Sequence, residues 1–263
     1  MIRRDQNALG MEQVTLRELA RRLLGSTDLF EGRSGASINY VVSHDGFTLR
    51  DLYSYAAKVN DRPWPYGPSS GGDDYNLSWD HGGDQAAQRQ AARTGLALLM
   101  ISSGAAMITG GDEMYRTQFG NNNPYNLDSP AIWLDWSEAD RHPAFLAFAR
   151  FLMMLRRTHR DLRAGEAELL TDAGVVAGAS YLDDPTRHFL GLLRGDAYVA
   201  YNGWQGTVRA TLPDPGGRVW RRVVDTASWM EPEQNHQPLD EAPAIDGLIY
   251  DVQGRSLAIF VKM

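Results

Sequence analysis

An almost entirely apolar run ends abruptly in a histidine and a carboxylate. Residues Ile38 to Ser43 form the run, and His44, Asp45 and Gly46 follow it. Such a run predicts a strand buried on both faces, as in parallel sheets. In α/β barrels the residues that do chemistry follow the carboxyl ends of these strands, so His44 and Asp45 are the first functional candidates. Asp45 could equally cap the next helix, and spacing alone does not decide between these two roles.

A second group of candidates lies in a long polar loop and beyond it. The loop runs from Asn60 to Gly83, and unstructured loops of this length are usually functional. Its aromatic rings could cover the apolar faces of sugars, or they could hold the loop together by packing on one another. These rings are Trp64, Tyr66, Tyr75 and Trp79. Arg116 and Asn122 follow a later apolar segment and are expected on the same face, although Asn runs also form plain turns.

Other chemistries need groups that this sequence supplies poorly. Asp45 and Glu113 lie at the ends of adjacent predicted strands and could pair as two catalytic carboxyl groups, and this pairing stays open as an alternative. Asp80, His81 and Asp84 match no tight ligand spacing, so neither a metal nor another cofactor is expected. The chain has no cysteine, which excludes disulfides, thiolate metal sites and a cysteine nucleophile.

Helices and strands alternate in the first part of the chain. Residues 14–25 predict a helix with Thr15 and Glu18 as a capping box and Gly25 as its terminator. A strand, a helix and a second strand in succession predict a right-handed crossover between parallel neighbours. Further helices are predicted over residues 48–58, 84–102 and 143–159, and the second buried strand over 105–109.

The pattern changes past Gly165 to short strands separated by turn signals, which predicts an antiparallel β domain. We therefore expect two domains, with residues 1–164 forming the first and residues 165–263 forming a β-sandwich. The predicted strands cover residues 189–193, 198–202, 208–212, 219–224 and 257–261.

The amino-acid composition limits the classes of partner that the chain is expected to bind. The 263 residues are 43% hydrophobic and 22% charged, which is typical of a folded globular chain. A formal net charge of −7 gives no basic footprint for nucleic acid, and no apolar run is long enough to cross a membrane. The densest basic cluster, Arg156, Arg157 and Arg160, is expected to complement a helix dipole. The expected ligand is therefore neutral, and neither nucleic acid nor membrane is an expected partner.

A set of motifs follows in order along the chain: His44-Asp45-Gly46, Trp64-Pro65-Tyr66-Gly67-Pro68, Tyr75-Asn76-Leu77-Ser78-Trp79-Asp80, Gly110-Gly111-Asp112-Glu113, residues 120–129 and Trp133-Leu134. A lone His-Asp pair would be weak evidence, whereas the ordered set is specific. In this order the segments resemble the carboxyl-terminal part of bacterial isoamylases and the related glycogen debranching enzymes of the α-amylase superfamily. The resemblance runs from near the start to Leu162 and continues weakly over residues 199–204.

The resemblance implies a fold and a site. The first domain would be an incomplete α/β barrel of the TIM type, with its last two strands and their helices. Asp45 would be the carboxylate that stabilises the transition state, and Asp112 with Glu113 would be structural. One departure from the family is local: residues 102–106 replace a more usual Gly-Thr-Pro. The residues that would bind substrate are His44, Trp64, Tyr66, Tyr75, Arg116 and Asn122.

The same resemblance implies that two motifs are missing. The family's nucleophilic Asp follows the fourth barrel strand and its acid/base Glu follows the fifth, and no segment before Ile38 looks like either motif. We therefore expect this chain to be the last part of a larger enzyme and inactive alone. Three origins stay open: a truncated reading frame, a fragment, or one piece of a split protein whose other polypeptide supplies the missing strands.

The implied reaction is hydrolysis of α-1,6 branch linkages in glycogen, amylopectin or limit dextrins. The alternative is a non-catalytic glucan-binding or assembly module, which is favoured if this open frame is the whole gene product. The compartment stays open, since the resemblance implies the cytoplasm for a glycogen debranching enzyme and secretion for a true isoamylase.

Overall fold

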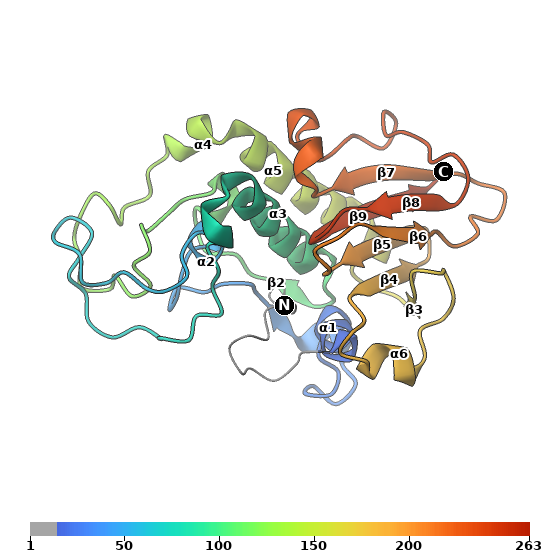
Figure 1. Cartoon of the computed structure of the whole chain (residues 1–263), viewed down its shortest axis with the longest axis horizontal. Helices are drawn as coiled ribbons and strands as arrows, with labels where there is room; N and C mark the ends of the chain where they lie inside the picture. Colours follow the sequence, from blue (N-terminus) through green and yellow to red (C-terminus); the bar gives the residue numbers. More distant parts are fainter. Residues whose placement is uncertain (1–14) are drawn as a thin grey trace.

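The computed structural model describes residues 15–263, in which a helical part and a β part lie side by side (Figure 1). Within those residues no helix is both long and apolar enough to cross a membrane. The elements of the helical part are α1 (Leu16–Leu23), η2 (Ser34–Ala36), β1 (Ile38–Asn39), α2 (Leu49–Leu52), η3 (His81–Gly83), α3 (Gln85–Ile101), β2 (Ala105–Ala106), η4 (Asp112–Met114), α4 (Glu138–Arg141), α5 (Pro143–Thr158) and η5 (Arg160–Leu162).

The strands β1 and β2 are parallel neighbours joined through α3, which confirms the predicted order of strand, helix and strand. The predicted length and burial of the first strand are wrong. β1 ends at Asn39, and the side chains of Ile38 and Tyr40 are 64% and 57% exposed. In the part of the chain that the structure describes, β1 has β2 as its one partner strand. Its other edge therefore lacks a neighbour that would extend the pairing and bury these side chains.

α1 coincides with the first predicted helix, but its capping box is wrong. The Thr15 side chain makes no capping hydrogen bond, and Glu18 forms ion pairs with Arg21 and Arg22 instead. These arginines are on the same helix face and compete for the carboxylate. Gly25 has a φ of +90°, and a Cβ there would collide with the backbone of Ser34, so glycine ends the helix as predicted.

α2 is much shorter than the helix predicted over residues 48–58. Thr48 caps it as expected, since its hydroxyl oxygen accepts the N–H of Asp51 at 3.1 Å. After one turn the carbonyl of Leu52 accepts the N–H of Trp79 at 3.0 Å. That carbonyl would have bonded to the next turn of a longer helix, so a contact with the distant loop replaces helix propagation.

α3 and α5 are the two long helices and lie at their predicted positions. The Asp84 carboxylate begins α3 by accepting the N–H groups of Ala86 and Ala87, at 2.9 and 3.2 Å. The apolar stripe of α5 is buried, as predicted. Its members are Phe145, Phe148, Phe151, Leu152 and Leu155.

Arg156, on α5, binds the carboxyl-terminal carbonyl groups of the neighbouring helix α3. Its guanidinium, on α5, donates to the carbonyl oxygens of Met100 and Ser102 at 2.5 and 2.8 Å, at the carboxyl end of α3. It also donates to the carbonyl of Gly104, just before β2. The expected dipole role therefore holds for the neighbouring helix, whose last carbonyls lack partners within the helix.

The β part consists of two antiparallel sheets. All five predicted strands are present, and β3 and β8 are additional. The larger sheet has the order β3-β4-β5-β9-β7, and β6 pairs with β8 in the smaller one. The elements are β3 (Glu168–Leu170), α6 (Ala179–Asp183), β4 (Phe189–Arg194), β5 (Ala197–Asn202), β6 (Val208–Thr211), β7 (Trp220–Asp225), η6 (Ser228–Glu233), β8 (Ile249–Val252) and β9 (Ser256–Lys262).

The larger sheet has a core on each face. One face packs on α3 and α5, in a cluster that joins Leu96 and Phe148 to Val199 and Ile259 (Figure 1). The other face packs on the smaller sheet, in a second cluster centred on Trp220. Full burial of such side chains stabilises a fold by about 1.5–3 kcal/mol each, so a substantial part of the stability comes from contacts between the two parts.

Candidate functional site

His44 and Asp45 lie in the loop that follows β1 and face solvent. Their side chains are 85% and 78% exposed, and Nε2 of His44 lies 3.2 Å from Oδ2 of Asp45. A donor and a carboxylate held this close can together bind neighbouring hydroxyl groups of a ligand. The structure therefore brings the two predicted residues into contact with each other and leaves them accessible.

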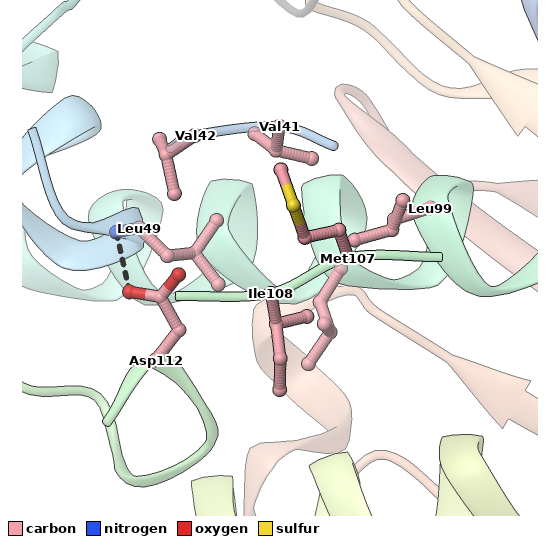
Figure 2. A pocket seen from close by; sticks show the side chains of 8 residues that line it. Val41, Val42, Leu49, Leu99, Met107, Ile108 and Asp112 are labelled. Carbon is pink, nitrogen blue, oxygen red and sulfur yellow. Dashed lines mark hydrogen bonds between the residues drawn. The ribbon is translucent and has the colours of Figure 1, made fainter. Parts of the chain in front are cut away.

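Apolar side chains fix this loop from below. Val41 and Val42 precede the His-Asp pair and line a small hollow with Leu99 of α3 and Met107, which follows β2 (Figure 2). Val42 is buried, so the loop is anchored to the layer beneath it. His44 and Asp45 are therefore accessible to solvent although the residues just before them are packed against the core.

Asp112 ties the loops after the two strands together. Its Oδ1 accepts the N–H of Leu49 at 2.9 Å (Figure 2). Its Oδ2 accepts the N–H of Thr109 at 3.2 Å. Burial raises the pKa of this carboxyl group to about 6. Its neighbour Glu113 accepts the N–H of Gly111 at 2.9 Å. Asp112 thus joins the backbones of the two loops, and Glu113 binds the backbone of its own loop. These contacts support the structural role implied for both carboxylates.

Asp51 likewise holds a distant loop through its carboxylate, and the sequence pattern did not predict this role. Its carboxylate is fully buried and accepts hydrogen bonds from Thr117 Oγ1, from the N–H of Gln118 at 2.7 Å and from the N–H of Gly120 at 3.3 Å. Burial raises the pKa of Asp51 despite these donors. Asp51 fixes the segment that leads from Arg116 to the asparagine run. Its only sequence signal is a helix-interior carboxylate, which is usually solvent-exposed.

Asn122 lies inside the protein and joins the two long loops. It is 1% exposed, and its Nδ2 donates to Asp73 O at 2.8 Å and to Asn76 Oδ1 at 2.7 Å. Its Oδ1 accepts a hydrogen bond from Asn60 Nδ2 at 3.0 Å. These partners occupy the amide, so Asn122 positions the loop of residues 60–83 and does not itself face a ligand in this arrangement.

The aromatic side chains of that loop divide into exposed and packed rings. Trp64 and Tyr75 are exposed. Tyr66 packs edge-on against Phe119, with ring centroids 4.9 Å apart, and Trp79 stacks on His81 at 4.0 Å. Trp64 and Tyr75 are therefore available to stack on a sugar, whereas Tyr66 and Trp79 also hold the loop.

Tyr66 and Arg116 line a shared hollow of about 260 Å³. Trp133 and Glu138 also line it, and neither His44 nor Asp45 does. The structure thus places His44 and Asp45 together after β1, and Tyr66 and Arg116 together in this hollow. Trp64, Tyr75 and Asn122 do not line the hollow. Glu138 is buried and accepts from Arg50 at 3.3 Å, a charged contact that no sequence spacing reveals.

His142 extends this charged cluster. Its Nε2 lies 3.1 Å from Oε2 of Glu138. Burial, aided by the nearby positive charge of Arg50, lowers the pKa of His142. Across residues 15–263, no three His, Cys, Asp or Glu side chains are grouped as a metal site would require.

Comparisons with known proteins give consistent results. The family described as isoamylase, C-terminal, matches residues 166–261. The chain is similar to an isoamylase from Flavobacterium sp., with 47% identity over 99% of this chain and 37% of that protein. It is also similar to a glycogen operon protein GlgX homolog of Mycobacterium tuberculosis H37Rv, with 44% identity over 58% of this chain and 22% of that protein.

The fold is similar to that of a pullulanase from Bacillus acidopullulyticus. The TM-score is 0.65 at 19% identity, over 96% of this chain and 27% of the pullulanase. The chain spans about a third of the length of the isoamylases that it matches.

Proposed function

This chain resembles the C-terminal part of an isoamylase or glycogen debranching enzyme of the α-amylase superfamily, and we propose that it serves the hydrolysis of α-1,6 branch linkages in a glucan such as glycogen. The proposal rests on one observation above all. An exposed His-Asp pair follows the first of two parallel strands, in a chain that is similar along 99% of its length to an isoamylase.

In this proposal β1 and β2 are the last two strands of an α/β barrel, and residues 1–164 are its final portion. The parallel pairing and the intervening α3 support this assignment. So does an apolar hollow of about 410 Å³ beside β1, lined among others by Leu19, Tyr40 and Leu98. A preceding barrel strand would cover it. Residues 165–263 form the second domain.

Asp45 is assigned the role of transition-state stabiliser. Its carboxylate would accept hydrogen bonds from sugar hydroxyls, and these bonds would strengthen as positive charge develops on the ring. His44 would donate to a neighbouring hydroxyl. Trp64 and Tyr75 would stack on further rings of the glucan. Tyr66 and Arg116 would line the path of the chain, with Asn122 positioning the loop.

These groups assist chemistry that other residues must begin. Removing one preorganised electrostatic group costs about 3–4 kcal/mol, whereas enzymes lower barriers by about 8–23 kcal/mol. The nucleophile and the acid would come from the polypeptide that supplies the other barrel strands. A branched α-glucan is the substrate in this scheme.

Reconstitution tests the proposal. The chain is expressed alone and together with a fragment carrying the first six barrel strands of an isoamylase, and reducing ends released from amylopectin are measured. We expect activity only in the combination, and a loss of about 100-fold or more for Asp45→Asn. Asp128→Asn, at an exposed position in the loop after β2, is the matched control. Equal activity of both variants would refute the role of Asp45.

A non-catalytic glucan-binding module is the second candidate, and the exposed rings of Trp64 and Tyr75 favour it. Binding of the isolated chain to amylopectin, with no activity in any combination, would support this candidate over debranching.

A further inference from the structure

A hollow of about 240 Å³ opens on the β part of the molecule. It lies between α6, the segment leading into β4 and the connection between β5 and β6. In Figure 1 α6 and β4 lie well away from α2 (Figure 1). The connection between β5 and β6 comes nearer to the long loop, because Trp204 bonds to the backbone of Arg255, whose guanidinium lies 4.8 Å from the centre of the Trp79 ring. The roles assigned to the helical part make no use of this hollow.

Trp204 provides an aromatic wall of the hollow. Its indole stacks on the ring of His188, with centroids 4.9 Å apart and planes inclined by 22°, yet the residue remains 40% exposed. Both the backbone N–H and the backbone carbonyl of Trp204 form hydrogen bonds. Its N–H donates to Asn202 Oδ1 at 2.9 Å, and its carbonyl accepts the N–H of Arg255 at 2.8 Å. The ring is therefore preorganised and still accessible to a ligand.

Polar groups surround this aromatic wall. The hydroxyl of Tyr181 lies within hydrogen-bonding distance of Asp172 Oδ1, at 3.2 Å, and of Phe189 O, at 3.0 Å. The guanidinium of Arg187 lies 5.3 Å from the centre of the Tyr181 ring. Arg187 also forms an ion pair with Asp184, at 3.4 Å. Its charge is thus balanced by carboxylates, so the lining favours a neutral ligand with groups that both donate and accept hydrogen bonds.

An aromatic face beside a carboxylate and a guanidinium suits a pyranose ring. The ring's C–H face packs on the indole, while its hydroxyls donate to the carboxylate and accept from the guanidinium. The volume is below the range of about 300–1,000 Å³ found for sites that enclose a small molecule. The hollow therefore fits one ring of a chain that continues into solvent better than a whole enclosed oligosaccharide.

We propose that this hollow is a second carbohydrate site, in which Trp204, Asp172 and Arg187 bind one glucose unit of an α-glucan. The choice of glucose as the sugar rests on the proposed debranching function, whereas binding of a neutral pyranose rests on the hollow alone. Such a site keeps the β part attached to a large branched polymer while other branches are cleaved elsewhere. Such a site would raise the effective concentration of glucan branches near the candidate site, and it would take no part in the hydrolysis itself.

The test measures binding and requires no hydrolysis. The 263-residue chain migrates through native gels containing increasing amylopectin, and the retardation gives an apparent Kd. We expect Trp204→Ala to weaken retardation by roughly tenfold, and Arg187→Ala, at an exposed position that the core does not need, by a smaller factor. Trp229→Ala removes another exposed tryptophan of the β part and is the matched control.

Far-ultraviolet circular dichroism and the unfolding midpoint establish that each variant is folded. Unchanged retardation of folded Trp204→Ala and Arg187→Ala proteins would overturn the proposal, as would an equal loss in Trp229→Ala. Asp45→Asn should migrate like the wild type, because Asp45 does not line this hollow. Absence of debranching in the reconstituted enzyme, with retardation still dependent on Trp204, would refute the proposed function and leave this site standing as a sugar site.

Discussion

The carboxylate of Asp112 accepts the backbone N–H of Leu49 at 2.9 Å, across the gap between the two loops that follow the parallel strands. This contact makes the base of the His44 loop depend on a buried acid. Burial raises the pKa of that acid to about 6, well above the ordinary value of 3.8. The ionised form is therefore disfavoured in the folded protein relative to the unfolded chain.

The first prediction concerns pH. Because the folded-state pKa of Asp112 is raised, its stabilising contribution is fully present below about pH 3.8 and is lost as the pH rises to about 6. The free energy of unfolding of the wild type, measured by urea at pH 4 to 7, should fall by about 3 kcal/mol relative to Asp112→Asn across this window. Parallel pH profiles for the two proteins would show that the group does not titrate as the structure implies.

The second prediction concerns Asn122. Asn122→Ala removes three hydrogen bonds, with Asn60 Nδ2, Asp73 O and Asn76 Oδ1, at a cost of about 0.5–1.5 kcal/mol each. Limited proteolysis should then cut the loop of residues 60–83 several-fold faster than in the wild type. Asn126→Ala, at an exposed position four residues further along the chain, should leave the cleavage rate unchanged. A loop cut equally fast in all three proteins would mean that Asn122 does not hold it.

The third prediction concerns the shared core. Phe148 of α5 is fully buried in the cluster that also contains Val199 and Ile259 of the larger sheet. Phe148→Ala should lower the free energy of unfolding by about 3–5 kcal/mol and shift the transitions of both parts together. Met154→Ala, at a largely exposed position on the same helix, should have little effect. Loss of the helical part with the β part unshifted would show that the cluster does not couple them.

The fourth prediction concerns the exposed edge of β1. Ile38 and Tyr40 are exposed beside the apolar hollow of about 410 Å³, so the isolated chain should self-associate. The double substitution Ile38→Lys and Tyr40→Lys should shift the mass measured by light scattering toward the monomer and reduce dye binding. A wild-type chain that is already a monomer and binds no dye would contradict this expectation.

Local patterns predicted the elements whose stability is mostly local. The apolar stripe beginning at Phe145 and the cap at Asp84 predicted α5 and α3, and β-rich runs predicted the strands of the larger sheet. The short length of α2 depended on a contact that no local window of sequence contains, because the Leu52 carbonyl accepts the N–H of Trp79. The capping box of α1 failed for a local reason, since Glu18 pairs with Arg21 and Arg22, three and four residues further on, and not with a backbone N–H.

The candidate site divides in the same way. His44 and Asp45 could be found because an apolar run ends in two polar residues. The partners of Asp51, at Thr117 to Gly120, lie 66 to 69 residues further along the chain. Asn60, a partner of Asn122, lies 62 residues before it. Hydrogen bonds between such distant residues follow no periodic pattern in the sequence, so the partners of a polar residue could not be predicted from its residue type. The functional roles of all seven predicted residues remain predictions: His44, Asp45, Trp64, Tyr66, Tyr75, Arg116 and Asn122.

Glu231 of the β part forms ion pairs with Arg89 and Arg93 of α3, and Arg93 is almost wholly buried. This junction restricts recombination between related genes. A chimera joined near residue 165 that inherits an uncharged residue in place of Glu231 would leave a buried guanidinium with no counter-charge, at a cost of about 3–5 kcal/mol. The two parts can be exchanged between relatives only when both sides of this junction come from parents that share the same charges.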